Sequence, residues 1–298
     1  MTVTVRTIAL TELSASSTLE VHPELASTNA LFHERFVDKH EQFAPFYAIA
    51  TTSQTAGKGR LDREWIAPPG CTLALSVYAE FPASAAQRAM GWVSLSAGLA
   101  LREVLASRIV ANHIGIKWPN DVQLDGAKVA GILGELLGVV DGGRAFACVI
   151  GIGVNTRIPE DQLPTEQATS LQLKGVAVDP LDLAPELIRA IARRLTALAD
   201  ADGDADASGL RDELRRHCST IGADVAVTLA DGTALRGRAI GVDALGRLEV
   251  RDGQGQLHSV SVGDVEHVRP AEADVRSAEA DSRRTEAEPR PAEAEDEQ

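Results

Sequence analysis

The sequence contains few aromatic residues, few cysteines and no long apolar run. Aromatic side chains make up only 4% of its 298 residues, so a buried core has to be built from Ala, Leu, Val and Ile. The cysteines Cys71, Cys148 and Cys218 lie far apart, which argues against a disulfide framework and against a cysteine-based zinc site. The seven histidines form no metal-binding pattern such as HExxH. The longest apolar run, residues 129–140, is interrupted by Glu135 and is too short to cross a bilayer.

Basic residues are also scarce. Asp and Glu number 43 against 29 Lys and Arg, and the resulting net charge of -14 would repel a nucleic-acid backbone. Residues 1–17 contain one basic residue and no continuous apolar stretch, so they do not read as a secretory signal peptide. We therefore expect a protein of the reducing cytoplasm that binds neither nucleic acid nor membrane.

The charge is concentrated at the C-terminal end. Residues 271–298 hold ten acids against four arginines, a net charge of -6 that leaves -8 for the rest of the chain. Val275 is the one apolar residue larger than Ala in this segment, so it cannot bury enough surface to offset its ordering entropy. We predict a disordered acidic tail. A short isolated helix is the alternative, limited by Pro289 and Pro291.

Periodicity and turn residues predict two domains before this tail, as the length also suggests. Residues 1–217 alternate between helical and strand patterns, with Asp125-Gly126 marking a hairpin between two apolar runs. The helices are expected at 25–42, 84–109, 183–199 and 209–217, and the strands at 46–51, 72–78, 114–124, 128–136 and 145–151. Residues 218–270 contain short alternating strands separated by turn pairs, which is typical of a small SH3-like barrel. The predicted fold is α+β, a mixed sheet flanked by helices plus a small C-terminal β-barrel.

A loop with two cations between glycines follows the strand at 46–51. Its core reads Gly57-Lys-Gly-Arg60, with Arg63 close behind. Glycines let a backbone approach a ligand, while Lys and Arg bind phosphate or carboxylate. It is not a Walker A loop, because Lys58 is followed by Gly59. A flexible, solvated connector explains the pattern equally well.

The segment Lys117-Trp-Pro-Asn-Asp121 has two interpretations. It is either a turn with Trp118 in the core and Lys117 pointing outward, or a polar corner of a site. In the second case Lys117 binds an anion, and Asp121 binds Mg²⁺ or a nucleophilic amine.

Three further motifs each have a structural and a functional interpretation. Lys128 precedes a wholly apolar stretch, so it either neutralises a carboxylate or phosphate or protects an edge strand. Residues 151–155 either end a strand or admit a flat ring between glycines, with Asn155 bonding an adenine or phosphates. Residues 27–29, Ser-Thr-Asn, either cap a helix or offer hydroxyls and an amide to a small polar ligand.

Five motifs occur together and in a fixed order along the chain, at 27–29, 54–63, 117–121, 128–133 and 151–155. In this combination they resemble the motifs of biotin protein ligases. The resemblance covers about residues 20–270. It implies a class II synthetase-like catalytic domain and a two-step reaction that uses ATP, biotin and Mg²⁺. Biotin is first converted to biotinyl-5'-AMP with release of pyrophosphate. A lysine on the biotin carboxyl carrier domain of a carboxylase then takes the biotinyl group and AMP is released.

The resemblance also implies roles for individual residues. Lys128, Arg60 and Asp121 are the expected catalytic residues, with Lys128 facing the biotin carboxylate and α-phosphate and Asp121 orienting the incoming amine. The residues assigned to biotin are Ser27, Thr28, Asn29, Gln54, Gly57, Gly59, Arg60, Lys128 and Gly131. The residues assigned to ATP or the adenylate are Lys58, Arg63, Trp65, Lys117, Asn120 and Asn155. The candidate Mg²⁺ ligands are Asn120 and Asp121.

Other functions are also compatible with parts of the pattern. Lipoate or octanoate ligases have a related fold but an Arg-Arg-x-Ser-Gly-Gly type of motif that this chain does not contain. A non-catalytic biotin or carrier binder would not need the cations, and an adaptor role for the small β-domain lacks an aromatic groove. Twenty-six residues precede Ser27, too few for the helix-turn-helix of bifunctional ligase/repressors, so we expect a monofunctional type. Both a monomer and a homodimer are possible.

One departure from the family pattern has a functional consequence. Many members read Gly-Arg-Gly-Arg-x-Gly-Arg where this chain has Gly57-Lys-Gly-Arg-Leu-Asp-Arg63. Lys58 keeps the charge but loses the bidentate guanidinium, and Asp62 places a negative charge beside the adenylate. We therefore predict that this chain releases its adenylate faster than a member with the full pattern. Measured adenylate dissociation checks this, and a rate no faster than that member's contradicts it.

Overall fold

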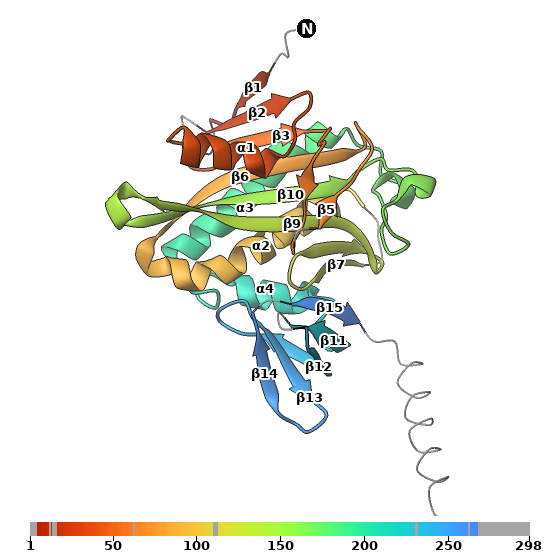
Figure 1. The fold of residues 1–298 in the computed structure, drawn as a ribbon. Helices are drawn as coiled ribbons and strands as arrows, with labels where there is room; N and C mark the ends of the chain where they lie inside the picture. The colour runs from red at the N-terminus through yellow and green to blue at the C-terminus, as the bar shows by residue number, and fades with distance from the viewer. Residues whose placement is uncertain are drawn as a thin grey trace, which may run out of the picture.

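The computed structural model describes residues 5–11, 13, 17–61, 63–109, 113–229, 232–261 and 263–267. The predicted tail at 271–298 and the loop residue Asp62 lie outside the described residues. A large mixed sheet carries helices on both faces, and a smaller antiparallel sheet lies beyond one edge of it (Figure 1). The predicted α+β architecture is confirmed.

Eight strands form the large sheet in the order β1-β2-β3-β6-β10-β9-β8-β7. Strands β2 and β3 pair in parallel and the other neighbours are antiparallel, which makes the sheet mixed. The strands are β1 (Arg6–Ala9), β2 (Thr18–His22), β3 (Ala48–Thr51), β6 (Thr72–Pro82), β7 (Ile114–Lys117), β8 (Asp121–Leu124), β9 (Ala127–Val140) and β10 (Ala145–Asn155). The predicted hairpin at Asp125-Gly126 is present, and both residues have positive φ, as its turn requires.

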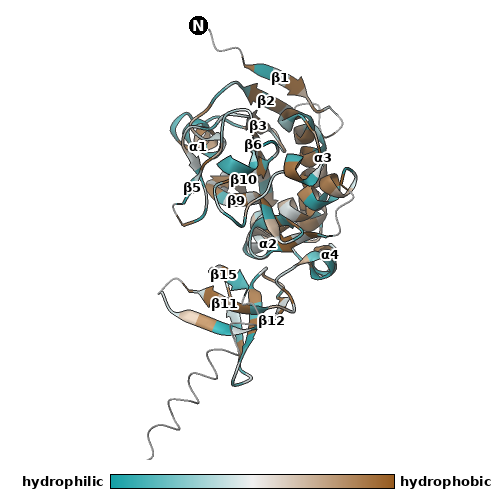
Figure 2. Cartoon of the chain, turned by 90° about the vertical axis from the view of Figure 1, so that its right-hand side faces the viewer, coloured by the Kyte–Doolittle hydropathy of each residue, from teal (hydrophilic) through white to brown (hydrophobic). Residues whose placement is uncertain are grey.

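Two long helices cover one face of this sheet, and a short helix lies on the other (Figure 2). The long helices are α2 (Ala83–Ala106) and α3 (Ala184–Asp200), and the short one is α1 (Thr28–His33). In α3 the buried residues recur every three or four positions, at Leu187, Ile191, Leu195 and Leu198. In α2, Gly98 faces the sheet, where an added Cβ would lie 3.4 Å from side-chain atoms of Ile116 and Ile132, at the short limit of ordinary van der Waals contact.

The remaining helical segments are short. They are η1 (Glu34–Asp38), η2 (Asp141–Gly143), η3 (Glu160–Gln162), η4 (Gln172–Lys174), η5 (Pro180–Leu183) and α4 (Leu210–His217). The helix expected at 25–42 is therefore shorter than predicted, with Ser27 as its N-cap and a π-helical continuation, η1, that ends at Asp38. No helix in the described part of the chain is long and apolar enough to cross a membrane.

The small sheet has five antiparallel strands in the order β14-β13-β12-β11-β15. These strands are β11 (Asp224–Thr228), β12 (Ala234–Val242), β13 (Leu248–Asp252), β14 (Leu257–Val260) and β15 (Asp264–His267). The predicted short antiparallel strands are confirmed. Among the described residues no pairing joins β14 to β15, so closure into an SH3-like barrel is not confirmed.

Two buried tryptophans connect the large and small sheets. The indole N–H groups of Trp92 on α2 and Trp118 donate to the carbonyl oxygens of Ala244 and Gly246, each at 2.9 Å. Both acceptors lie in the turn between β12 and β13, so hydrogen bonds from two directions hold this turn. Because a buried indole N–H needs a partner, these contacts favour one docking geometry for the small sheet.

The close approach of α2 to this turn makes Gly91 sensitive to substitution. A Cβ at Gly91 would lie 2.0 Å from the carbonyl oxygen of Leu245. We predict that Gly91→Ala lowers the free energy of unfolding by about 1–3 kcal/mol, even though Ala favours a helix over Gly by about 1 kcal/mol. Chemical denaturation measures the change. Gly253→Ala is the matched control, because nothing lies within 4 Å of its added Cβ. Equal stability of the two variants would contradict the prediction.

Candidate functional site

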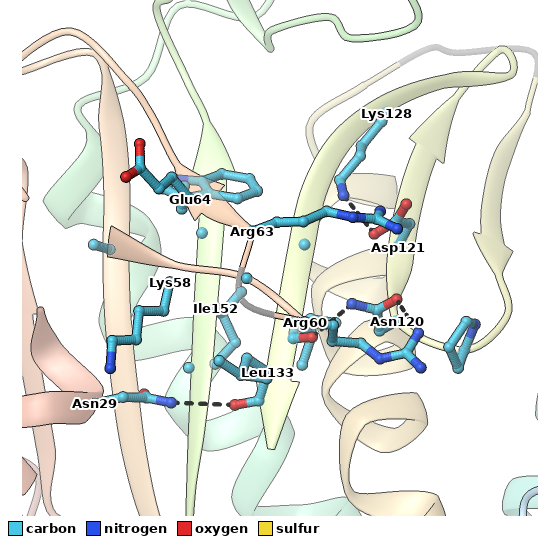
Figure 3. Close-up of a pocket in the computed structure, with 18 of the residues that line it drawn as sticks. Asn29, Lys58, Arg60, Arg63, Glu64, Asn120, Asp121, Lys128, Leu133 and Ile152 are labelled. Carbon is cyan, nitrogen blue, oxygen red and sulfur yellow. Dashed lines mark hydrogen bonds and ion pairs between the residues drawn. The ribbon is translucent and has the colours of Figure 1, made fainter. Parts of the chain in front are cut away.

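A cavity of about 370 Å³ opens on the face of the large sheet that carries α1 (Figure 3). Residues from all five predicted motifs line this cavity, although they are separated by up to 126 positions in the sequence. The predicted site residues in its wall are Ser27, Thr28, Asn29, Gln54, Lys58, Gly59, Arg60, Arg63, Trp65, Lys117, Asn120, Asp121, Lys128 and Gly131. The structure thus brings together fourteen of the sixteen residues named from the sequence.

One end of the cavity is polar and uncharged. The Ser27 hydroxyl caps α1 by accepting the N–H of Ala30, so this motif is a helix cap as well as part of the wall. The Thr28 N–H donates to Gln54 Oε1 at 2.8 Å. Buried Ser76 on β6 lies behind them, with its Oγ 2.7 Å from Thr28 Oγ1 and 2.6 Å from Asn29 Oδ1. Hydroxyl and amide groups therefore form a connected network at this end.

Glycines on neighbouring strands form the floor of the cavity. Gly131 on β9 lies opposite Gly153 on β10 in the strand register. A Cβ at Gly153 would lie 2.5 Å from Trp65 Cε2, and one at Gly131 would lie 2.9 Å from Trp65 Cζ3. Trp65 belongs to β5 (Glu64–Trp65), which pairs with β4 (Gly57–Lys58) in the loop above the sheet. Only glycines leave room for a flat ring against these two strands.

The other end of the cavity is cationic. Lys128 Nζ lies 2.7 Å from Asp121 Oδ1 and 5.8 Å from the ring centroid of Trp65. Arg60 Nη1 donates to Asn120 Oδ1 at 3.3 Å. Burial lowers the pKa of Arg60 and that of Lys117, and for Lys117 the carboxylate of Asp121 opposes the shift. Several cations are thus partly desolvated around one carboxylate, an arrangement suited to binding an anion.

Backbone hydrogen bonds on both sides hold Lys128 in place. Its N–H donates to the carbonyl of Gln167 at 2.7 Å, and the N–H of Thr169 donates to the Lys128 carbonyl at 2.8 Å. At Lys128, strand β9 pairs with β8 on one side and with Ala168 on the other, so the explanation of Lys128 as an edge-strand charge does not hold. The lysine is presented by an inner strand and points toward Asp121 (Figure 3).

The small sheet contributes directly to the cationic end. Arg60 Nη2 donates to the carbonyl of Gly263 at 3.4 Å, and Val265 and Glu266 of β15 line the cavity. The N–H of Trp118, which is 1% exposed, donates to Thr220 Oγ1 at 3.0 Å. Trp118 is therefore a buried core residue, as the structural interpretation predicted, and it also lines the cavity together with Lys117 and Asn120.

Two of the predicted residues do not line the cavity. A Cβ at Gly57 would lie 2.7 Å from the Trp65 carbonyl oxygen, so the absence of a side chain there permits the β4–β5 pairing. Asn155 is buried, and its Nδ2 donates to the carbonyl of Thr169 at 3.0 Å. Their assignments to biotin and to nucleotide stay predictions.

Sequence analysis missed several wall residues. They include Glu64, Leu133, Gln167, Val265 and Glu266. Leu133 follows Gly131 at the two-residue period of a strand, which was a usable signal. Gln167, Val265 and Glu266 reach the cavity only through the tertiary fold, so no local pattern identifies them.

The residues present are compatible with a bound Mg²⁺ ion only if a ligand completes its coordination. Within the described part of the chain, no group of three or more His, Cys, Asp or Glu side chains could hold a metal. Asn120 and Asp121 do line one cavity, and Mg²⁺ commonly binds one or two protein oxygens together with substrate phosphates.

Two family models match this chain. The biotin/lipoate A/B protein ligase family matches residues 23–155, and the biotin protein ligase C-terminal domain matches residues 220–268. The biotin–[acetyl-CoA-carboxylase] ligase of Mycobacterium tuberculosis is 38% identical over 220 residues, which are 72% of this chain and 77% of that protein. The bifunctional ligase/repressor of Escherichia coli is 36% identical over 57% of this chain and 50% of its own length.

Solved structures have the same fold. The biotin protein ligase of Aquifex aeolicus in complex with biotin and ATP superposes with a TM-score of 0.64. The match covers 84% of this chain and 98% of that one, at 21% sequence identity.

The glycine floor makes the position of Trp65 testable. We predict that Gly153→Ala displaces the Trp65 ring, because the added Cβ would overlap it, and shifts part of the tryptophan emission toward the red. Stability should fall by no more than about 1 kcal/mol, since a loop side chain can move aside. Emission spectra measure the shift, and Trp65→Phe provides the background, because Trp92 and Trp118 stay buried. A red shift that persists in that background would contradict the assignment to Trp65.

Proposed function

This chain belongs to the biotin protein ligase family, and from that membership we propose that it attaches biotin to a lysine on the biotin carboxyl carrier domain of a carboxylase, using ATP. The observation that carries the proposal is the division of one cavity into an uncharged hydrogen-bonding end and a cationic end. Biotin has the same division, with an uncharged cyclic urea at one end and a carboxylate at the other. The enzyme is an AMP-forming biotin–[biotin carboxyl-carrier protein] ligase.

The first step joins biotin to the nucleotide. A biotin carboxylate oxygen attacks the α-phosphorus of ATP, the bond from that phosphorus to the β-phosphate oxygen breaks, and pyrophosphate leaves. Negative charge builds up around the α-phosphate, so fixed cations stabilise the transition state. We assign this role to Lys128 and Arg60. Lys58 and Arg63, which line the same cavity on the loop above the sheet, close over the adenylate.

The second step transfers the biotinyl group. A neutral lysine amine of the carrier attacks the carbonyl carbon of the mixed anhydride, the carbon–oxygen bond to AMP breaks, and the amine loses a proton to solvent. Asp121 lies beside the cationic end, where its carboxylate can orient that amine. Asp121 is thus proposed to hold Lys128 first and the incoming amine later.

The remaining wall residues divide between biotin and nucleotide. Ser27, Thr28, Asn29 and Gln54 bind the urea ring, and Gly59 and Gly131 shape the biotin pocket. Trp65 offers an aromatic face to the nucleotide, and Lys117 binds its phosphates. Asn155 stays assigned to the nucleotide, and its Nδ2 also donates to the Thr169 carbonyl in the segment that holds Lys128.

Mg²⁺, the partner and the location belong to the same proposal. Asn120 and Asp121 would hold Mg²⁺ together with the ATP phosphates, and the ion would neutralise charge on the leaving pyrophosphate. The carrier domain is the proposed protein partner, and nucleic acid is not, given the net charge of -14. We place the enzyme in the cytoplasm, as a monomer or homodimer. The domain limits we propose are 1–217 for catalysis and 218–270 for the small β-domain.

Biotin-dependent ATP–pyrophosphate exchange tests this function. We predict exchange with biotin and none with lipoate or octanoate, and a loss of at least about 100-fold in Lys128→Ala, as for removal of a preorganised charge-stabilising group. Lys174→Ala is the matched control, since Lys174 pairs with Asp125 outside the cavity.

Each other outcome has a distinct meaning. Exchange with lipoate or octanoate would assign the chain to the related acyl ligases. Biotin binding without pyrophosphate exchange would indicate that the chain is a non-catalytic biotin-binding protein. Exchange that survives in Lys128→Ala would overturn the role given to that lysine.

A further inference from the structure

The polar end of the cavity depends on a carboxylate that lies behind it. Glu135 on β9 does not line the cavity, yet its Oε2 accepts a hydrogen bond from Asn29 Nδ2 at 2.5 Å. Its other oxygen lies 3.8 Å from His33 Nε2. Glu135 is the charged residue that interrupts the apolar run at 129–140, and the roles assigned so far do not use it.

Glu135 determines which way the Asn29 amide points. An ionised carboxylate only accepts hydrogen bonds, so it requires the NH₂ group of the amide on its side. The carbonyl of Leu133, 3.4 Å from the same nitrogen, makes the same demand. The Oδ1 atom of Asn29 therefore faces Ser76, whose oxygen is 2.6 Å away. Gly151 makes this placement possible, because a Cβ there would lie 2.5 Å from Asn29 Oδ1.

The amide orientation in turn fixes the protons of two hydroxyl groups. Ser76 has one proton and two oxygens in reach, Asn29 Oδ1 at 2.6 Å and Thr28 Oγ1 at 2.7 Å. Because Asn29 Oδ1 can only accept, it takes the Ser76 proton. The Thr28 proton then goes to Ser76, or to Gln54 Oε1 at the longer distance of 3.2 Å. In both cases the Thr28 hydroxyl donates its hydrogen bond within the protein, so Oγ1 faces the cavity as an acceptor.

The neighbouring amide provides the complementary group. Gln54 Oε1 accepts the N–H of Thr28 at 2.8 Å, which leaves Nε2 as the donor of that amide. The cavity thus presents an acceptor, Thr28 Oγ1, beside a donor, Gln54 Nε2. A cyclic urea needs this pair, since its ring N–H donates and its carbonyl accepts.

We propose that Glu135 is a positioning residue that sets the direction of this hydrogen-bond relay and thereby makes the cavity selective for a ligand with a ring N–H group. The inference rests on the proposed biotin substrate, which carries that group. Acids without it, such as lipoate or octanoate, leave the oriented groups unpaired, and unpaired buried polar groups disfavour binding.

The sign of the effect separates positioning from simple electrostatics. Glu135 is a negative charge near a site for a carboxylate and phosphates, so on charge alone its removal should strengthen biotin binding. Loss of the relay direction predicts weaker binding. Glu135→Gln keeps the size and the ability to hydrogen-bond Asn29, but it can donate as well as accept. The amide orientation is then favoured only by the longer contact with the Leu133 carbonyl, at 3.4 Å.

Pyrophosphate exchange and calorimetric biotin binding on the full chain measure the effect. For Glu135→Gln we expect the KM and Kd for biotin to rise about tenfold, the size expected for one lost net hydrogen bond. The KM for ATP, kcat and the melting temperature should stay unchanged. Glu80→Gln is the matched control, because Glu80 lies on the same sheet and accepts a hydrogen bond from Tyr78 outside the cavity.

Exchanging the amide and the carboxylate between positions 29 and 135 provides a rescue experiment for biotin binding. Asn29→Asp alone places two carboxylates in contact, so the KM for biotin should rise. In the double variant Asn29→Asp with Glu135→Gln, the amide introduced at position 135 donates to the carboxylate introduced at position 29. The other oxygen of that carboxylate still accepts from Ser76, and the net charge is that of the original chain. The double variant should return the KM to within about threefold of the original value.

Two results would overturn the inference. The first is an unchanged or lower KM for biotin in Glu135→Gln, and the second is a double variant no better than Asn29→Asp alone. Either result leaves the proposed function intact, since the original chain still binds and activates biotin. A chain that neither binds biotin nor exchanges pyrophosphate overturns both proposals.

Discussion

The register of β9 against β10 is the constraint on which the rest of the site depends. It places Gly131 opposite Gly153 and Leu133 opposite Gly151, so glycines from two strands meet in one floor. Lys128 and Glu135 lie on the same strand, on either side of that floor. Because side chains alternate between the faces of a strand, a slip of one residue would turn this floor toward α2 and remove the cavity. The long pairing of β10 with both β9 and β6 protects against that slip.

The small sheet is part of the site because it reaches the cationic end by two routes. Its β12–β13 turn holds Trp118 through Gly246, which steadies the corner that carries Lys117 and Asn120. Its residue Gly263 accepts from Arg60, the cation of the loop above the floor. The pKa of His267 on β15 is lowered by burial and by nearby Lys117, so this contact adds no further positive charge at neutral pH. Docking of the small sheet therefore affects two of the cations at once.

The sequence predicted the local structure best at positions where the backbone geometry tolerates few residue types. Asp125-Gly126 predicted a hairpin because few residues accept positive φ, and the motif at 27–29 predicted a cap because only short polar side chains reach the first turn. The sequence predicted too long a helix at 25–42 and did not predict strands β1, β2 and β15. These errors arise where local residue type does not determine the structure. Short edge strands and helix ends depend on partners distant in sequence, as Arg6 pairs with Val21 and Val227 with Val265. Glu135 was recognised only as a break in an apolar run, because its contact with Asn29 spans 106 positions.

The charge distribution explains how a chain with a net charge of -14 can bind an anionic nucleotide. Long-range attraction does not favour ATP, so the affinity has to come from the local arrangement of cations. Burial lowers the pKa of Lys117 and Arg60, which means that their charged forms lack part of their solvation inside the cavity. The carboxylate of Asp121 offsets part of that deficit through its attraction for both cations. An entering carboxylate or phosphate offsets the rest, so the cations interact more strongly with a ligand than solvated surface charges would. The same partial desolvation favours the transition state of adenylation, in which negative charge grows beside groups already held in place.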